Sequence, residues 1–184
     1  MKLRDWAGWE NPTFSPLHDP ARDVIKAYQD AARHLDALQE WTYIEAGLIQ
    51  TGKHIHQMAH WMPQQFDKFG DMLHENHLMV EYPSTPEFPH IYADMDEVFE
   101  SIINILDEIQ GALFKFRAAA EKNSATLPMA LYAEDLMQRA SNQRTIITEM
   151  WQMYDDPDVG PTSFDNWVMH LTEGRNLFDG EDDE

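Results

Sequence analysis

Two stretches of the sequence place apolar residues at alternating spacings of four and three, and this pattern constrains the fold more than any other feature. The first stretch has Ile91, Met95, Val98, Ile102, Ile105, Ile109, Ala112 and Phe116. The second has Met129, Ala133, Leu136, Ala140, Gln143, Ile147, Met150 and Tyr154, of which Gln143 is polar. In an α-helix this spacing brings the residues to one face. The connection 123–126 is short, so the two helices are expected to pack as antiparallel neighbours.

The first half of the chain predicts two more helices. One covers about 20–47, with Asp19 as the expected N-cap and Pro20 in the first turn. The other runs from 47–53 to about Tyr82 and contains Pro63, which either kinks it or divides it in two. The segment 82–89 holds three prolines and is predicted to be a loop. The expected fold is all-α, an antiparallel four-helix bundle without strands.

The bundle accounts for residues 19–156. Residues 1–18 are expected to form an irregular N-terminal arm, and residues 157–184 a short helix around 164–171 followed by an acidic tail. A chain of 184 residues suits one domain. It has neither an apolar stretch of the roughly 20 residues that a membrane span needs nor the pattern of a signal peptide. A cytoplasmic location is therefore expected.

Composition excludes several kinds of site. The chain has no cysteine, which rules out disulfides and thiolate metal sites. Its formal net charge is -20 with only 13 Lys and Arg, so direct nucleic-acid binding is not expected. The same charge attracts cations, including metal ions.

The histidines are distributed unevenly: eight of the nine lie between positions 18 and 90. In the helix expected at 47–82, a row of potential ligands borders the apolar stripe, and its members are His56, His60, Asp67, Asp71, His74, His77 and Glu81. Glu75 is a further candidate oxygen ligand. Imidazole and carboxylate without sulfur suit iron, with zinc and manganese as alternatives. The other interpretation is that these residues are the polar flank of an amphipathic helix.

The two later helices do not add inward-facing ligands. Their acidic residues fall off the apolar faces, among them Asp96, Glu97, Glu100, Asp107, Glu134 and Glu149. A di-iron centre inside a bundle needs inward carboxylates from several helices. Any metal site is therefore expected on the helix at 47–82, with Glu40, Glu45 or another subunit supplying further ligands.

The segment from Lys53 to His60-Trp61, followed by Leu73-His74-Glu75, resembles the motif of the Dps-like (DNA-protection-during-starvation) relatives in the ferritin-like superfamily. The resemblance covers about 50–155. It implies a bundle whose first helix closes at the His-Trp pair and whose second opens at Leu-His-Glu. In that case the chain breaks near Pro63, and residues 20–47 form an extra helix.

By this resemblance, His60 and His74 are paired iron ligands in a centre between two subunits, and Asp96 and Glu100 match the family's acidic segment. The sequence also departs from the family. The two histidines are farther apart, and Leu78 stands where the family has an acidic residue, with His77 and Glu81 as local replacements. The lysine-rich arm that some members use on DNA is absent.

The predicted function is therefore a ferritin-like, homo-oligomeric iron protein. It oxidises Fe(II) with O2 or peroxide at a His/carboxylate centre, for iron storage or protection from oxidative stress. The alternative is a helical interaction or scaffold module without a metal site, which docks through aromatic residues near its two ends, Trp6, Trp9, Phe14, Phe164 and Trp167. A third interpretation is that 171–177 resembles a targeting peptide of ferritin-like cargo proteins.

Overall fold

The computed structural model describes residues 15–79, 82–88 and 91–173. These residues form helices and connections and contain no strand. The elements are η1 (Ser15–Leu17), α2 (His18–Ile44), α3 (Ile49–Glu75), α4 (Met95–Ala120), η2 (Ser124–Thr126), α5 (Leu127–Tyr154) and α6 (Pro161–Glu173). Residues 1–14 of the expected arm (1–18), residues 174–177 of the segment 171–177 and the acidic tail lie outside the described residues.

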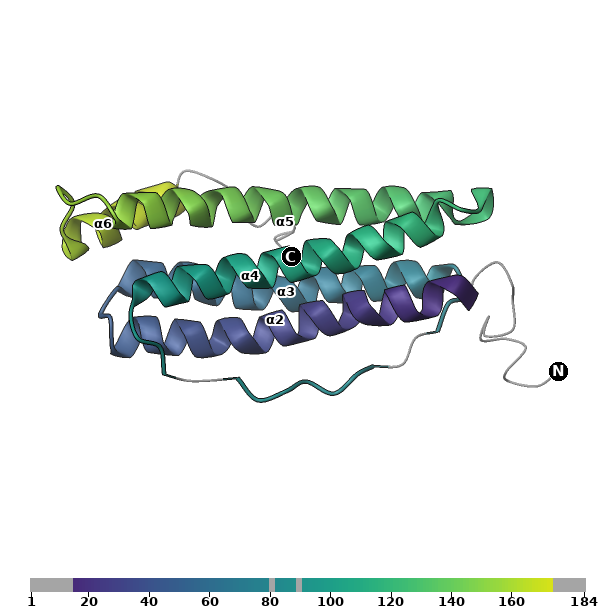
Figure 1. The fold of residues 1–184 in the computed structure, drawn as a ribbon, viewed down its shortest axis with the longest axis horizontal. Coiled ribbons are helices and arrows are strands. Elements are labelled where there is room, and N and C mark those ends of the chain that lie inside the picture. The colour runs from purple at the N-terminus through teal and green to yellow at the C-terminus, as the bar shows by residue number, and fades with distance from the viewer. Residues whose placement is uncertain (1–14, 80–81, 89–90, 174–184) are drawn as a thin grey trace.

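The four long helices form an antiparallel bundle with one long crossover (Figure 1). Short turns join α2 to α3 and α4 to α5, so each pair is antiparallel. The connection from α3 to α4 runs back along the bundle, and these two helices are therefore parallel (Figure 1). Because α2 packs on both α3 and α4 while α5 packs mainly on α4, α3 and α4 lie diagonally opposite. The four-helix-bundle prediction is confirmed.

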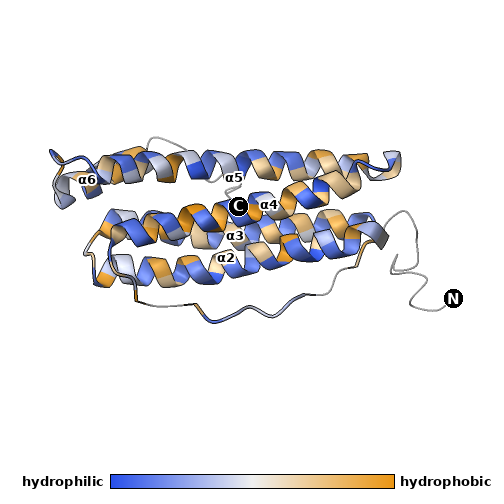
Figure 2. Cartoon of the chain, in the orientation of Figure 1, coloured by the Kyte–Doolittle hydropathy of each residue, from blue (hydrophilic) through white to orange (hydrophobic). Residues whose placement is uncertain are grey.

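The core consists of the apolar faces that the spacing predicted, and each helix carries apolar and polar faces (Figure 2). Ile91 is the exception, with 85% of its surface exposed. It precedes α4, which begins only after Asp94, whose carboxylate accepts a hydrogen bond from the Glu97 N–H at 3.0 Å. This N-cap fixes the start of α4. At α2 the expected cap is wrong: the helix begins at His18, and no side chain caps it.

Helix α3 continues through Pro63 without a break. Proline has no N–H, so the Ala59 carbonyl loses its helical partner, but the side chain of Pro63 is on the exposed side and clashes with no other helix. The break that the resemblance implies is therefore not present. Helix α2 is the first helix of the bundle and not an extra one.

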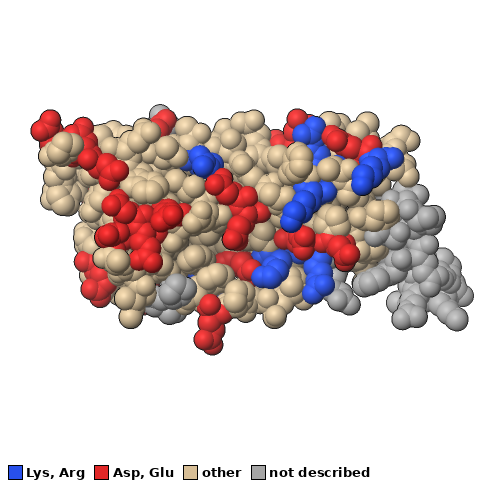
Figure 3. Space-filling model, in the orientation of Figure 1, with Lys and Arg blue, Asp and Glu red and all other residues tan. Residues whose placement is uncertain are grey.

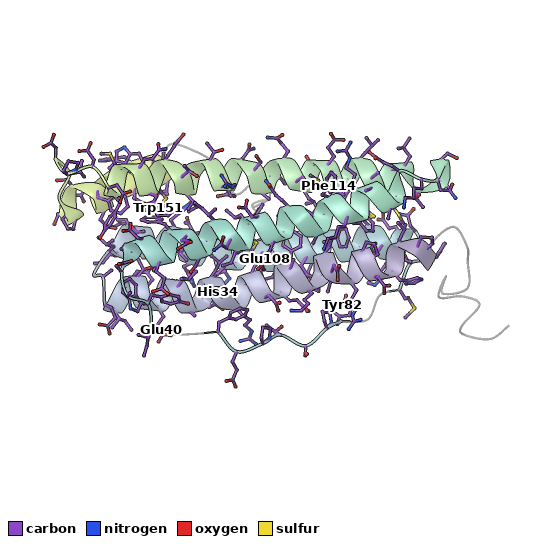
Figure 4. The ribbon with its side chains drawn as sticks, viewed as in Figure 1. His34, Glu40, Tyr82, Glu108, Phe114 and Trp151 are labelled. Carbon is purple, nitrogen blue, oxygen red and sulfur yellow. The ribbon has the colours of Figure 1, made fainter. Side chains whose placement is uncertain are left out.

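Two further segments pack on the bundle. The crossover is anchored on α2 by Phe88, whose ring stacks on the ring of His34 with centroids 4.6 Å apart. His34 is on α2 (Figure 4). The predicted short C-terminal helix is confirmed as α6, which buries Phe164 and Val168 against the bundle. Asp165 of the same helix caps the first turn of α3. Within the described residues, no helix combines the length and apolar character that a bilayer crossing requires.

Candidate metal site on helix α3

The predicted ligand row lies on the solvent-facing side of α3. Its members on the helix are all exposed, namely His56, His60, Asp67, Asp71 and His74, and Glu75 is exposed too. His77 follows the helix end, is exposed, and has a positive φ of 60°. Glu81 lies outside the described residues. The row is therefore accessible to metal ions from solvent.

Because α3 is continuous, His60 and His74 cannot bind the same ion within one chain. They are fourteen residues apart on one helix, which places them about 21 Å apart along its axis. Within one chain the two histidines therefore belong to different places on α3, and their pairing across a subunit interface stays a prediction. The row instead has two parts, one at 56–60 and one at 67–75, separated by the turn that contains Pro63.

The first part is a close pair of imidazoles. His56 and His60 have their Nε2 atoms 3.2 Å apart, with ring centroids at 4.4 Å and ring planes at 84°. The His56 Nδ1–H donates a hydrogen bond to the Gln39 Oε1 at 2.9 Å. A carboxamide oxygen can only accept, so the neutral ring of His56 carries its hydrogen on Nδ1 and a lone pair on Nε2.

Gln39 was not among the candidates from the sequence. It lies on α2, one residue before Glu40, which the sequence had singled out and which is exposed. Only the packing register of α2 against α3 brings position 39 opposite position 56. The same register places Tyr43 on Gly52.

The second part of the row is rich in carboxylates. Asp71 is followed by His74 and Glu75 at i+3 and i+4, so the three share one helical turn. In the conformation described, no three His, Asp or Glu side chains converge on a point within 15–79, 82–88 and 91–173. Asp71, His74 and Glu75 are all exposed, so other helices do not enclose their side chains.

The acidic residues of α4 do not join the row. Asp96 is exposed and accepts a hydrogen bond at 2.8 Å from the Nε1–H of Trp151, which lies on α5 (Figure 4). Glu100 is exposed on the same helix. Since α4 lies diagonally opposite α3, neither can reach an ion bound on α3 of the same chain. The roles that the resemblance implied for Asp96 and Glu100 would need another subunit and stay a prediction.

The interior of the bundle offers no acidic ligands. Among the described residues no Asp or Glu is buried, and the buried polar side chains are Thr42, Thr51, His54, Gln65, Thr126 and Gln143. Burial lowers the pKa of His54 from 6.5 to about 4, and burial raises the pKa of the Tyr28 hydroxyl above its usual range. The prediction that α4 and α5 supply no inward carboxylates is confirmed, which leaves the outer face of α3 as the candidate site.

Charge is distributed unevenly along the bundle (Figure 3). Acidic side chains gather where α4 begins and α5 ends, and they include Asp94, Asp96, Glu97, Glu100, Asp155, Asp156 and Asp158. The opposite end carries cations such as Lys115, Arg117 and Lys122. The acidic end produces a negative potential that attracts metal cations from solution.

The structure is similar to solved structures of the ferritin PmFTN. One iron-soaked variant matches with a TM-score of 0.71 and 12% identity, over 82% of this chain and 98% of that chain. A second matches with a TM-score of 0.71 and 10% identity, over 84% and 98%. A third, also soaked in iron, has a TM-score of 0.70, 10% identity and the same coverage.

No protein-family model matches the sequence, and no curated protein is similar to it. At such low identities the structural likeness establishes the fold alone, and the fold is ferritin-like. The crossover between α3 and α4 is the connection that distinguishes ferritin-like bundles from simple up-down bundles. The closer relation to the Dps-like members remains a prediction.

Proposed function

We propose that this protein binds Fe(II) on the outer face of α3 and oxidises it there. The observation that carries the proposal is the exposed turn with Asp71, His74 and Glu75 on a ferritin-like bundle. Carboxylate and imidazole donors suit iron. Asp67, one turn earlier, and His77, just after the helix, are additional donors or partners that orient the imidazole.

The chemistry asked of these residues is modest. Carboxylates favour the more highly charged Fe(III) over Fe(II), so they assist loss of one electron from each iron to O2 or peroxide. A solvent-facing turn leaves coordination positions on the iron for the oxidant. The role in the cell would be iron storage or protection from oxidative stress.

The test is ferric formation after Fe(II) is added to the purified protein in air. In the Asp71→Asn/His74→Ala variant we expect the rate to fall to that of buffer. The matched control is His56→Ala/His60→Ala, which removes two exposed histidines from the same helix and should keep the wild-type rate. A wild-type rate equal to that of buffer would reject the proposal and favour the metal-free interaction module.

The proposal includes assembly of several copies in the cytoplasm, for which the ferritin-like fold is the support. Sedimentation of the purified chain gives the subunit number directly. A strictly monomeric protein would rule out iron storage in a cage. Oxidation of Fe(II) on α3 would still be tested by the rate assay.

A further inference from the structure

We infer that His56 and His60 form a separate binding site for a late divalent transition-metal ion, namely Cu²⁺, Ni²⁺ or Zn²⁺. The site is independent of the proposed iron chemistry at 67–75. It rests on the two Nε2 atoms 3.2 Å apart and on Gln39, which holds the His56 ring.

The separation of the two nitrogens fits coordination of one ion. Bonds from imidazole nitrogen to Zn²⁺ are about 2.0–2.1 Å. Two nitrogens 3.2 Å apart at such distances enclose an angle of about 100° at the metal. That value lies between the angles of square-planar and tetrahedral geometry, which Cu²⁺ or Ni²⁺ and Zn²⁺ prefer. An ion can therefore bridge the pair without movement of the helix.

One of the two imidazoles is already prepared for the metal. Gln39 accepts from the Nδ1–H of His56, so the Nε2 of His56 points its lone pair toward His60. Such a hydrogen bond from the far ring nitrogen orients metal-binding histidines and raises their basicity. His60 is exposed and needs only to carry its hydrogen on Nδ1 to offer a second lone pair.

The donor set selects late metals over iron. The nearest carboxylate of the row, Asp67, is seven residues beyond His60, or about 10 Å along the axis. Lys53, one turn before His56, donates a hydrogen bond to the Gln50 Oε1 at 3.3 Å and so extends away from the pair. With two neutral nitrogens as the protein ligands, affinity follows the order Fe²⁺ < Ni²⁺ < Cu²⁺, with Zn²⁺ below Cu²⁺.

The experiment is a titration of the purified full chain with Ni²⁺, Cu²⁺, Zn²⁺ and, without oxygen, Fe²⁺. We expect one late-metal ion per chain to bind at this pair. In the Asp71→Asn/His74→Ala variant, which lacks the proposed iron site, Fe²⁺ should bind at least tenfold more weakly than Ni²⁺. The His56→Ala/His60→Ala variant should lose at least tenfold in Ni²⁺ affinity. Both residues are exposed, so the fold should be kept, and circular dichroism verifies this.

Two further variants separate this site from general histidine binding. His74→Ala/His77→Ala also removes two imidazoles, and it should keep the Ni²⁺ affinity of the wild type. Gln39→Ala should weaken binding by about tenfold, as for other partners of metal-bound histidines, whereas Gln39→Glu should retain it. The Cu²⁺ complex should show two nitrogen ligands in its electron paramagnetic resonance spectrum.

Three results would overturn the inference. These are equal Ni²⁺ affinity in wild type and His56→Ala/His60→Ala, an equal loss in His74→Ala/His77→Ala, or Fe²⁺ binding as tight as Ni²⁺ in the Asp71→Asn/His74→Ala variant, which lacks the proposed iron site. The iron proposal is judged on other variants by its oxidation rate. Either can therefore fail while the other stands.

Discussion

The carboxylate of Asp165 in α6 caps the first turn of α3 through Thr51. Its Oδ1 accepts hydrogen bonds from the Thr51 N–H at 2.9 Å and from the Thr51 hydroxyl at 3.0 Å. The Gln50 N–H donates to both carboxylate oxygens at 3.0 Å. The N-cap residue itself, Leu48, has no side-chain acceptor. A residue 114 positions later in the chain thus satisfies donors that a helix start leaves unpaired.

Replacing Asp165 with Ala should destabilise the protein by about 1–3 kcal/mol, because hydrogen bonds to a charged group are lost and buried donors remain. Urea unfolding followed by circular dichroism measures the change. Asn166→Ala is the control, since Asn166 is exposed on the same helix. Equal effects of the two substitutions would mean that the cap contributes nothing to stability.

Gly52 and Gly111 should respond in opposite directions to Ala. A Cβ at Gly52 would lie 3.0 Å from ring carbons of Tyr43, where α2 and α3 pack closely, whereas at Gly111 nothing lies within 4 Å. We expect Gly52→Ala to cost about 1–3 kcal/mol and Gly111→Ala to stabilise by about 0.5–1 kcal/mol through helix propensity. Thermal unfolding of both variants measures this. Stabilisation by both would mean that Tyr43 moves aside.

Buried His54 should make stability depend on pH. Its pKa is lowered from 6.5 to about 4 by burial. Between these values the unfolded chain binds a proton and the folded chain does not, so the full contribution is present above pH 6.5 and falls as pH drops toward 4. The loss should reach about 3 kcal/mol.

Urea unfolding at several pH values compares the wild type with His54→Leu, which should lack this part of the pH dependence. His170→Ala, at an exposed position on α6, should keep it. Parallel stability curves for the wild type and His54→Leu between pH 6.5 and 4 would contradict the prediction.

Nickel or zinc should raise the melting temperature of the wild type. An ion at 100 times its Kd that binds only the folded state contributes about 2.7 kcal/mol, or roughly 5–10 °C for a chain of this size. Pro63 weakens the helix just after the pair, and the metal links the turn that precedes it. His56→Ala/His60→Ala should show no rise, and an equal rise in that variant would place the ion elsewhere.

The fold could be predicted from the sequence because the apolar spacing in α4 and α5 indicates which side chains face the core. The short connections then determine which helices are antiparallel. The start of α4 is predicted too early, at Ile91, because the apolar spacing extends to the N-terminal side of the Asp94 cap. Apolar spacing alone does not identify an N-cap.

The site could be predicted only as a set of residues on α3. Proline removes one hydrogen bond of its own helix wherever it faces, and whether the helix continues across Pro63 depends on the packing of the flanking turns, which the sequence pattern does not show. The partnership of Gln39 with His56 depends on the register of two helices, and glutamine carries no ligand signal of its own. The cap by Asp165 could not be predicted either. Nothing in the residue before α3 indicates that the acceptor for the N–H groups of its first turn comes from another helix.

That cap has a consequence for the order in which the molecule matures. Chains are synthesised from the N-terminus, and domains form as their segments become available. The residues of α2 and α3 are synthesised long before Asp165. Until Asp165 has been added, the backbone N–H groups of Gln50 and Thr51 therefore lack this acceptor. The four long helices can pack as soon as α5 has been synthesised. The first turn of α3 receives its cap only later, when nearly all of the described chain has been made.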